Sequence, residues 1–375
     1  MPVDNSNEKE IKTLIHPRKN IIAFVLAHNE EDIIRSAIDS ILTQTVKVDV
    51  VVISDNSTDN TVSIVKSIAA TNSRVSLIET VGNKFKKSGA LNAAYQNIDL
   101  EPYDYVLSVD GDTVLAPDLV EQALIEFQLD PLLGAVCSRA GVVKQITNGF
   151  FEKLVYHWQY VEYAEFDRSR ISQDRSIKVA HGMCTVYKVE AIKAVMSRRI
   201  ATGKLDCTLY DVHNITEDYE LTVTLKELGY HVAAGFGMYA WTDVPLKLSE
   251  LWKQRVRWLR GGLDTLWEHG WNKSTRKDIL NAGFFWIMLS FQIILLYYAL
   301  YDIVRGVYLP NWLFLLVMSI MYIDCVYTLR YVQNPSKWDY LIRMTFIPQL
   351  FYAWFTIAQL VYAYYLFLFK PNQDW

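Results

Sequence analysis

The chain has 375 residues, of which 51% are hydrophobic and 13% aromatic, and its formal net charge is -4. This charge argues against a general nucleic-acid binder, because such proteins neutralise phosphates with a basic face, and we expect no nucleic-acid partner. The cysteines are Cys137, Cys184, Cys207 and Cys325, and no C-x-x-C pair occurs among them. This spacing argues against a disulfide framework and against a thiolate metal site.

Residues 1–19 form a polar segment that lacks the apolar run of a signal peptide, so we expect this end to stay in the cytoplasm. From residue 20 to about residue 112, short β-branched runs alternate with helical patterns, as a parallel α/β sheet requires. The expected strands are residues 21–26, 48–54, 75–79 and 105–109, and the expected helices are residues 31–42 and 60–70. Polar residues follow these strands, and open α/β sheets bind their ligands at that edge.

Two carboxylates separated by one residue, Asp110 and Asp112, follow the last of these strands. Hard oxygen ligands of this kind hold Mg²⁺ or Mn²⁺, which bridges to a diphosphate and offsets the charge on a departing nucleotide. An isolated Asp-x-Asp pattern more often marks a solvated turn. Its place directly after an apolar strand favours the metal site, so we predict Asp110 and Asp112 as ligands of a divalent metal, Mn²⁺ or Mg²⁺.

Two other segments offer groups for a nucleotide. Asp55 lies at the end of the second strand, where polar side chains could bind a base or ribose. A plain turn with a helix cap at Asp59 explains part of this pattern. Lys87 lies at a helix start, where a cation and backbone N–H groups suit phosphate oxygens, although an exposed basic turn would look similar.

The motif T-E-D ends at Asp218, just before a helical run, and an acid there could take the proton of an acceptor hydroxyl. Acids also stabilise helix N-termini, so capping is the alternative. Further along, Gln254, Arg257 and Trp258 combine an indole that could stack on a sugar ring with a guanidinium that could reach phosphate. By itself, this second segment is simply an amphipathic helix.

Residues 149–163 and 246–267 combine apolar stripes with aromatic and basic side chains, which suits helices at a membrane interface. Ordinary core-facing helices are the alternative. The interface is favoured by three later stretches without Asp, Glu, Lys or Arg: residues 279–301, 306–323 and 344–369. Each is close to the roughly 20 apolar residues that span a bilayer as a helix, although buried core helices are the alternative here too.

Basic residues precede the first expected span, and others lie between the second and the third: Lys273, Arg276, Lys277, Arg330, Lys337 and Arg343. Segments rich in basic residues stay in the cytoplasm, so we expect both of these segments to be cytoplasmic. The middle span ends at Asp324, an acid that should face protein or water rather than lipid. We therefore predict an integral protein of the plasma membrane with a cytoplasmic catalytic domain.

Together and in this order, the motifs resemble the processive-type family-2 glycosyltransferases, the group that includes cellulose and hyaluronan synthases. The resemblance covers residues 20–265. The nucleotide-sugar contacts that it implies are Ala27, Asn29, Glu30, Asp55, Lys87 and Asp110, and the implied metal ligands are Asp110 and Asp112. The implied acceptor contacts are Gly182, Cys184 and Trp258, and the implied catalytic group is Glu217, Asp218, Gln254, Arg257 and Trp258.

The resemblance implies an α/β GT-A-type, Rossmann-like catalytic domain with amphipathic interface helices, followed by an all-α transmembrane region of about three helices. The implied divisions are residues 20–240 for the cytoplasmic domain, 241–275 for the interface region with Q-x-x-R-W, and 276–375 for the transmembrane region. The implied reaction is inverting transfer of a hexose or N-acetylhexosamine from a UDP-sugar to a saccharide or lipid-linked acceptor, with Asp218 as the general base.

Three alternatives stay open. A processive polysaccharide synthase ranks slightly below transfer of one or a few sugars, because three spans would need a homo-oligomer to complete a polymer channel. A polyprenyl-phosphate sugar transferase would share the α/β domain and the metal but would not need Gln254, Arg257 and Trp258. A third alternative is a non-catalytic nucleotide-sugar-binding subunit. The presence of Asp218 together with both metal carboxylates argues against it.

Overall fold

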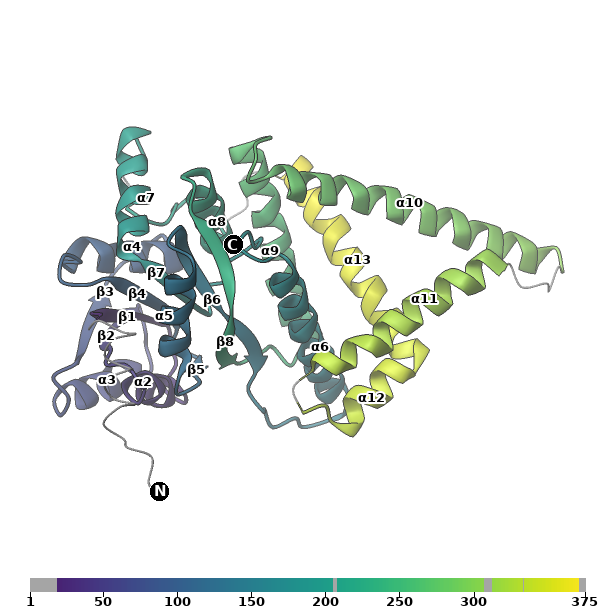
Figure 1. Cartoon of the computed structure of the whole chain (residues 1–375). Coiled ribbons are helices and arrows are strands. Elements are labelled where there is room, and N and C mark those ends of the chain that lie inside the picture. Colours follow the sequence, from purple (N-terminus) through teal and green to yellow (C-terminus); the bar gives the residue numbers. More distant parts are fainter. Residues whose placement is uncertain (1–18, 205–207, 307–311, 333, 371–375) are drawn as a thin grey trace, which may run out of the picture. The chain divides into compact units, whose positions relative to one another are not determined.

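The computed structural model describes residues 19–204, 208–306, 312–332 and 334–370. The chain divides into two compact units (Figure 1). The sheet unit comprises Met1–Arg139, Gln173–His213 and Thr224–Thr242, and the helical unit comprises Ala140–Ser172, Asn214–Val223 and Asp243–Trp375. Cys207 and all but the last residue of the expected polar segment 1–19 lie outside the described residues. The expected domain boundaries at residues 240 and 275 stay predictions.

Four parallel strands form one half of the sheet, with β1 between β2 and β4 and with β3 beyond β2. They are β1 (Ile21–Ala27), β2 (Asp49–Asp55), β3 (Val75–Thr80) and β4 (Tyr105–Asp110). Each confirms an expected strand and ends one residue later than expected, so Ala27, Asp55 and Asp110 are themselves strand residues. The central strands are buried on both faces, as parallel strands between two helical layers must be.

Helices cover both faces of these strands, and Figure 1 shows α2 and α3 on one side with α4 on the other. The helices of the sheet unit are α2 (Ile34–Leu42), α3 (Thr61–Ala69), α4 (Lys86–Asn97), α5 (Leu119–Leu129) and α7 (Val189–Ala201). Helix α2 begins later than expected because Glu31 belongs to a turn. The backbone N–H of Glu31 donates to the Asp59 carboxylate, and the Glu31 carboxylate accepts the N–H of Asn60 at 3.0 Å.

In the other half of the sheet, β7 pairs antiparallel with both β4 and β6, and β5 pairs antiparallel with β8. The strands of this half are β5 (Val114–Leu115), β6 (Leu133–Val142), β7 (Cys184–Lys188) and β8 (His231–Thr242). The full order is β3-β2-β1-β4-β7-β6-β8-β5. The sequence patterns do not predict this half, because its strands pair with partners far away in the chain rather than in a repeating strand-helix unit.

The helical unit contains both amphipathic segments as helices, α6 and α9. Its helices are α6 (Phe150–Ser172), the start of α8 (Glu217–Glu227), α9 (Leu248–His269), α10 (Arg276–Val304), α11 (Trp312–Thr328), α12 (Lys337–Met344) and α13 (Phe346–Phe369). Trp158 of α6 is 2% exposed and stacks on Tyr352 of α13, with ring centroids 4.9 Å apart. Val155, Leu251 and Ile342 complete this cluster, so α6 and α9 each bury part of their apolar stripe in protein.

Among the described residues, two helices are long and apolar enough to cross a membrane. They are Arg276–Val304, with a mean hydropathy of 2.0, and Pro348–Phe369 within α13, with a mean hydropathy of 1.3. Little of either segment is buried, 6% of the first and 22% of the second. The remaining expected span is 306–323, and its residues 307–311 lie outside the described residues. The helix described in this region, α11, has 17 residues. Two of the three expected spans thus meet the criterion, and the third stays a prediction.

Candidate active site

Turns at the carboxyl ends of β1 and β2 are tied together by hydrogen bonds. Asn29 has a left-handed backbone (φ 58°), and its side chain accepts the N–H of Thr58 at 2.7 Å. Glu30 donates its N–H to the beginning of α3. His28 Nδ1 lies 2.5 Å from the carbonyl oxygen of Asp55. The predicted residues Asn29 and Glu30 are therefore held beside the end of β2, where Asp55 lies.

Asp55 is 8% exposed, and its Oδ1 is fixed by three donors. These are Thr80 Oγ1 at 2.8 Å, Asn83 Nδ2 at 3.0 Å and Asn56 Nδ2 at 2.9 Å. The expected helix cap at Asp59 is wrong by one residue, because the N-cap of α3 is Asn60; Asp59 accepts the N–H of Thr61 in the turn before it. Asp55 is thus an oriented carboxylate at the ligand edge of the sheet and not part of a helix cap.

Lys87 and Asp110 form an ion pair beside Gly182. Lys87 Nζ lies 2.5 Å from Asp110 Oδ1, and the two side chains are 29% and 33% exposed. A Cβ added to Gly182 would lie only 2.5 Å from Lys87 Nζ and 3.9 Å from Asp110 Oδ2. The structure thereby brings together three of the predicted residues from α4, β4 and the segment before β7. Lys87 is not part of a plain exposed turn.

Asp112 follows a close approach between two strands. The N–H of Gly111 donates to the carbonyl oxygen of Leu26 at 2.7 Å, and a Cβ at Gly111 would lie 2.8 Å from that oxygen. Asp112 Oδ1 accepts from Thr113 Oγ1 at 3.2 Å. Burial, followed by the neighbouring Asp110 carboxylate, raises the pKa of Asp112 to about 6. The raised pKa indicates two carboxylates that repel each other within a partly buried site.

The donor set of Asp110 and Asp112 fits a hard divalent cation. Both ligands are carboxylate oxygens, and a cation would relieve the repulsion that raises the pKa of Asp112. Lys87, which donates to Asp110, supplies one positive charge beside the two carboxylates. The residues present therefore suit Mg²⁺ or Mn²⁺ together with a phosphate group.

Two predicted contact residues expose almost no surface. Cys184 is the first residue of β7 and is 0% exposed, and burial raises the pKa of its thiol far above the ordinary value. Ala27 ends β1 and is 1% exposed. Ligand contacts at Ala27 and Cys184 stay predictions, and their side chains serve the packing of the sheet.

In the helical unit, the T-E-D motif forms the first turn of α8. Asp218 Oδ1 accepts the N–H of Tyr219 at 2.7 Å, so the expected contact with the helix start is present. Glu217 is 7% exposed. Tyr219 donates its hydroxyl to Asp278 Oδ2 at 2.8 Å, which ties α8 to the first turn of α10. The turn that carries Asp218 is therefore anchored to the beginning of a candidate membrane span.

Helix α9 packs closely against the same turn. A Cβ at Gly261 would lie 2.5 Å from Thr216 Cγ2 and 2.8 Å from Ile215 Cγ1, so only glycine fits there without a shift. Arg257, about one turn earlier in α9, donates to the carbonyl oxygen of Ile215 at 3.4 Å. The T-E-D and Q-x-x-R-W motifs are thus neighbours in space.

Arg255 organises the Q-x-x-R-W motif from one of its variable positions. Its Nη1 donates to Gln254 Oε1 at 2.6 Å, and its Nη2 donates to Glu162 of α6 at 2.6 Å. Its guanidinium carbon lies 4.2 Å from the centroid of the Trp258 ring. Sequence reasoning missed Arg255 and Glu162, because a charged residue on an amphipathic helix normally faces water. The only signal was a second arginine inside the motif.

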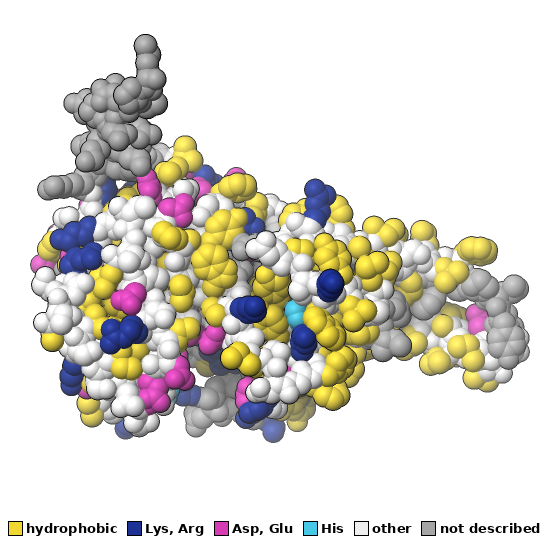
Figure 2. All heavy atoms as spheres, turned by 90° about the horizontal axis from the view of Figure 1, so that it is seen from below, with side chains coloured by type: hydrophobic (Ala, Val, Ile, Leu, Met, Phe, Trp, Pro, Cys, Tyr) yellow, Lys and Arg dark blue, Asp and Glu magenta, His cyan; other side chains and the backbone are white. Residues whose placement is uncertain are grey.

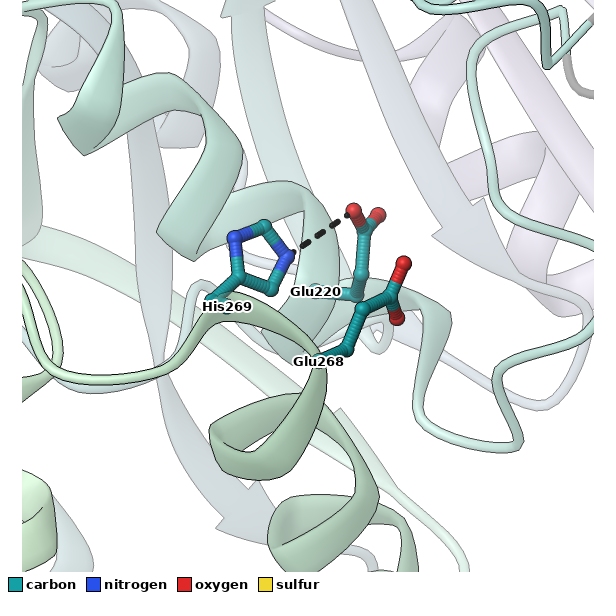
Figure 3. A group of neighbouring side chains, drawn as sticks. All are labelled: Glu220, Glu268 and His269. Carbon is teal, nitrogen blue, oxygen red and sulfur yellow. Dashed lines mark hydrogen bonds and ion pairs between the residues drawn. The ribbon is translucent and has the colours of Figure 1, made fainter.

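A second group that the sequence reasoning missed is shown in Figure 3. The possible ligand atoms of Glu220, Glu268 and His269 all lie within 4.8 Å of one another. His269 Nε2 lies 3.3 Å from Glu220 Oε1, and Glu220 is 0% exposed. Glu220 lies in α8, two residues after Asp218, and His269 is the last residue of α9, so this contact joins the two helices. We interpret it as a further link between these two helices.

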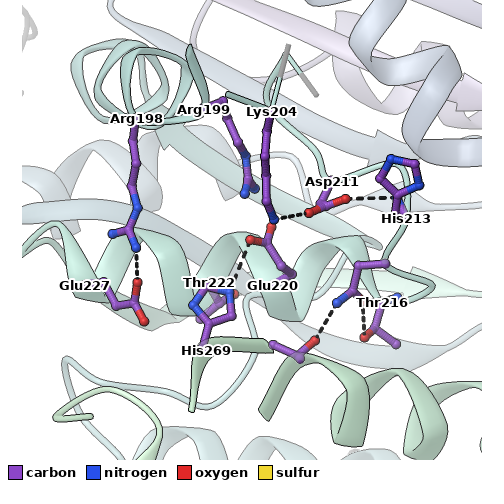
Figure 4. A network of polar contacts seen from close by, with 12 residues as sticks. Arg198, Arg199, Lys204, Asp211, His213, Thr216, Glu220, Thr222, Glu227 and His269 are labelled. Carbon is purple, nitrogen blue, oxygen red and sulfur yellow. Dashed lines mark hydrogen bonds and ion pairs between the residues drawn. The ribbon is translucent and has the colours of Figure 1, made fainter. Parts of the chain in front are cut away.

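In the sheet unit, polar contacts hold the segment that follows α7 (Figure 4). Lys204 Nζ lies 2.5 Å from Asp211 Oδ2. Asn92 of α4 donates to the carbonyl oxygen of Tyr210 at 2.8 Å and accepts the N–H of the same residue at 2.9 Å. The segment is therefore fastened to α4, the helix that carries Lys87.

Known proteins resemble the chain in both sequence and fold. Residues 23–196 match the family model Glycosyl transferase family 2. The poly-beta-1,6-N-acetyl-D-glucosamine synthase of Staphylococcus aureus strain MSSA476 is 29% identical over 251 residues, which cover 65% of this chain and 55% of that protein. The synthase of the same name from Staphylococcus epidermidis is 27% identical over 270 residues, 70% of this chain and 60% of that protein. The chain spans little more than half the length of these curated relatives.

A solved structure resembles nearly the whole chain. It is the mannosyltransferase PcManGT from Pyrobaculum calidifontis in complex with GDP-Man and Mn²⁺. The TM-score is 0.61 at 18% identity, over 96% of this chain and 89% of that one. This likeness, with the mixed sheet described above, confirms the expected GT-A-type fold.

Residues 23–196 are thus similar to a glycosyl transferase family 2 domain. Within that class, the two synthases confirm the resemblance to the processive-type members.

Proposed function

We propose that the chain transfers N-acetylglucosamine from UDP-N-acetylglucosamine to a saccharide acceptor, with inversion at the anomeric carbon. The sequence alone implies a hexose or N-acetylhexosamine, and the names of the relatives favour N-acetylglucosamine. These names also favour a processive synthase over transfer of one or a few sugars. The observation that carries the proposal is the ion pair of Lys87 and Asp110, with Gly182 leaving room beside it.

The diphosphate of the donor is bound by charge in this proposal. Asp110 and Asp112 would hold a divalent cation, Mn²⁺ or Mg²⁺, which neutralises charge on the leaving diphosphate. Lys87 donates to a phosphate oxygen once donor and cation draw it from Asp110, and this adds a second positive charge. Asp55, held by its three donors, accepts a hydrogen bond from the base or ribose.

Asp218 acts as the general base. Its carboxylate takes the proton of the acceptor hydroxyl as that oxygen bonds to the anomeric carbon. The bond from the anomeric carbon to the phosphate oxygen breaks, and UDP leaves with the electron pair. Trp258 stacks on the acceptor sugar, Arg257 adds positive charge, and Gln254 and Glu217 hold the motifs in place.

The membrane arrangement is also part of the proposal. The two candidate spans anchor the chain in the plasma membrane. Basic residues at the start of α10 and between α11 and α13 favour a cytoplasmic catalytic domain. The acceptor is then a growing saccharide or a lipid-linked sugar at that face, and a homo-oligomer could supply further walls of an export path.

The purified chain in proteoliposomes tests the donor and the product. UDP-N-acetylglucosamine, UDP-glucose, UDP-galactose and UDP-glucuronate are supplied with Mn²⁺ or Mg²⁺, and UDP release and product length are measured. We expect the fastest release from UDP-N-acetylglucosamine, loss of release with a chelator, and a polymeric product. Release from none of these donors would leave a binding subunit, and transfer only to a polyprenyl phosphate would support the rival transferase.

Asp218→Asn tests the assigned base. A general base contributes roughly 10² to 10⁴-fold to rate, so we expect a loss of that order in transfer. UDP binding, measured by calorimetry, should stay unchanged, whereas Asp112→Asn should weaken metal-dependent UDP binding. Loss of UDP binding in Asp218→Asn would remove this residue from the base role.

A further inference from the structure

A buried charged pair joins two helices of the helical unit. Oε2 of Glu162 in α6 lies 2.6 Å from Nη2 of Arg255 in α9, and the two side chains are only 12% and 7% exposed. Seen from below, hydrophobic side chains cover much of the surface of the C-terminal helices (Figure 2). Burying two charges costs free energy that their attraction only partly returns, and an apolar pair of similar size is often as stable. The groups that this pair orients therefore explain it better than the stability that it adds.

The guanidinium of Arg255 contacts two side chains of the Q-x-x-R-W motif in addition to Glu162. Its Nη1 donates to Gln254 Oε1 at 2.6 Å, and its central carbon lies 4.2 Å from the centroid of the Trp258 ring. Arg255 and Trp258 are three residues apart and so meet on neighbouring turns of α9. A guanidinium is planar and rigid, so a carboxylate that fixes one of its nitrogens also fixes the direction of the others. Glu162 thereby sets the position of the cation beside the indole of Trp258.

Glu162 is itself held by a third helix. The hydroxyl of Tyr352 in α13 donates a hydrogen bond to the Glu162 carboxylate. Tyr352 is 8% exposed, and its ring stacks on Trp158 of α6 with ring centroids 4.9 Å apart. The carboxylate thus has one fixed partner in α13 and another in α9, which restricts its orientation.

The exposure of these side chains separates the groups that can meet a ligand from the groups that hold them. Trp258 and Gln254 are partly exposed, whereas Arg255 is buried and bound to Glu162. Glu162 and Arg255 can therefore influence a bound saccharide only through the side chains that they hold. A binding group that is fixed in place before the ligand arrives lowers the entropic cost of binding and of reaching the reactive geometry.

We propose that Glu162 is a positioning residue for the saccharide acceptor, and that it acts through Arg255 on Trp258 and Gln254. The inference rests on the proposed function for the identity of the acceptor. It adds that α6 controls acceptor binding without contacting the sugar. Donor binding should be independent of this pair, because the carboxylates and the lysine assigned to the diphosphate belong to the sheet unit.

The chain contains a matched control for this pair. Glu165, about one turn later in α6, accepts from the buried Arg343 of α12 at 2.9 Å, and Arg343 also contacts Cys325 rather than a motif residue. Glu162→Gln is therefore compared with Glu165→Gln. Arg255→Lys is compared with Arg343→Lys, because lysine keeps the buried charge but lacks the planar fork, which guards against misfolding of the glutamine variant.

Transfer kinetics in proteoliposomes measure the effect on the acceptor. N-Acetylglucosamine oligosaccharides are the acceptors, and UDP-N-acetylglucosamine is the donor. We expect Glu162→Gln and Arg255→Lys each to raise KM for the acceptor roughly 10-fold and to leave KM for the donor unchanged. In a Trp258→Ala chain, Glu162→Gln should add little to the acceptor KM, because its effect passes through the indole.

Three kinetic results would overturn the proposal. An equal rise of the acceptor KM in Glu165→Gln and Arg343→Lys would show a general loosening of the helical unit. A parallel rise of the donor KM would show that the pair does not act on the acceptor alone. A full additional rise in the Trp258→Ala chain would show that Glu162 acts by another route.

Fluorine NMR separates this inference from the proposed function. The chain is labelled with 5-fluorotryptophan in detergent, and the Trp258 signal is identified as the one absent from Trp258→Phe. We expect this signal to move in Glu162→Gln and Arg255→Lys and to stay in place in the two control variants. A Trp258 signal that stays in place in all four variants would refute positioning by Glu162, whatever sugar is transferred. Absence of transfer by the wild-type chain would contradict the proposed function instead.

Discussion

Lys87 and Asp110 show how single residues at the sheet edge combine opposite charges where a diphosphate could bind. The two side chains are 29% and 33% exposed, so a phosphate or a cation can exchange partners with this ion pair at modest cost. Gly182 sets the space for this exchange, because any side chain there would displace the lysine. The chemistry of the site thus depends on a missing side chain as much as on charged ones.

Gly182→Ala should weaken donor binding. The new Cβ, 2.5 Å from Lys87 Nζ, would push the ammonium away from the phosphate position. Loss of a charge-assisted hydrogen bond costs about 1.5–3 kcal/mol, so we expect KM for the UDP-sugar to rise roughly 10- to 100-fold. Gly149→Ala is the control, since a Cβ there meets nothing within 4 Å. Equal KM values in the two variants would contradict the role of Gly182.

Asp130 should make the sheet unit sensitive to acid. Burial alone would raise its pKa, but hydrogen bonds from His231 Nδ1 (2.7 Å) and the N–H of Leu132 (3.0 Å) outweigh it and lower the pKa. A carboxyl with a lower pKa in the folded state stabilises that state above its unfolded pKa of about 4, and the gain is lost as pH falls through the folded pKa.

The variant Asp130→Asn removes this acid-sensitive contribution. We expect the melting temperature of the wild type to exceed that of Asp130→Asn near pH 6, and the difference to shrink on acidification to about pH 3. Thermal melts of both proteins in detergent across this range measure it. A difference that is constant with pH would show that the carboxylate charge is not what stabilises this contact.

At the scale of secondary-structure elements, α9 acts as a scaffold for two motifs. One side of the helix carries Arg255, which binds Gln254, Glu162 and the Trp258 ring. Another side offers Gly261 to the T-E-D turn. Since both motifs depend on the position of one helix, small shifts of α9 should affect both together.

Gly261→Ala and Gly262→Ala form a matched pair on α9. A Cβ at Gly261 would lie 2.5 Å from Thr216 Cγ2, whereas the nearest atom to a Cβ at Gly262 is 3.9 Å away. Overpacking costs about 1–3 kcal/mol, so Gly261→Ala should lower both the melting temperature and the transfer rate. Gly262→Ala should keep activity and gain about 1 kcal/mol from helix propensity. The same activity loss in both variants would refute close packing at Gly261.

At the scale of the whole molecule, a domain similar to family 2 glycosyltransferases and candidate membrane spans occur in one chain. The helices α10 and α13 expose apolar side chains along most of their length. Exposed apolar surface on this scale would aggregate in water, so we expect a bilayer to surround these helices. The link from Tyr219 to Asp278 then connects the T-E-D turn directly to the start of a span.

The chain should behave as an integral membrane protein with its catalytic side in the cytoplasm. We expect it to resist extraction from membranes by alkaline carbonate and to be released by detergent. An epitope placed before residue 19 should be protected from protease added outside intact cells and cleaved after the cells are opened. Cleavage of that epitope in intact cells would reverse the predicted orientation.

Local patterns in the sequence were enough to predict the parallel strands, the amphipathic helices and the motif residues. Buried β-branched runs and helical spacing are visible within a few residues, and Asp55, Asp110 and Asp218 each stand where such an element ends or begins. The GT-A fold and the resemblance to glycosyl transferase family 2 follow from these patterns with the comparisons.

Only the tertiary structure decided the features that depend on distant parts of the chain. The second half of the sheet, the role of Arg255 at a variable motif position and the close contact at Gly261 all rest on long-range packing. Helix α12 is the clearest case. Its sequence reads as an ordinary charged helix, and Asp339 and Arg343 turn inward because α6 supplies His157 and Glu165 as partners.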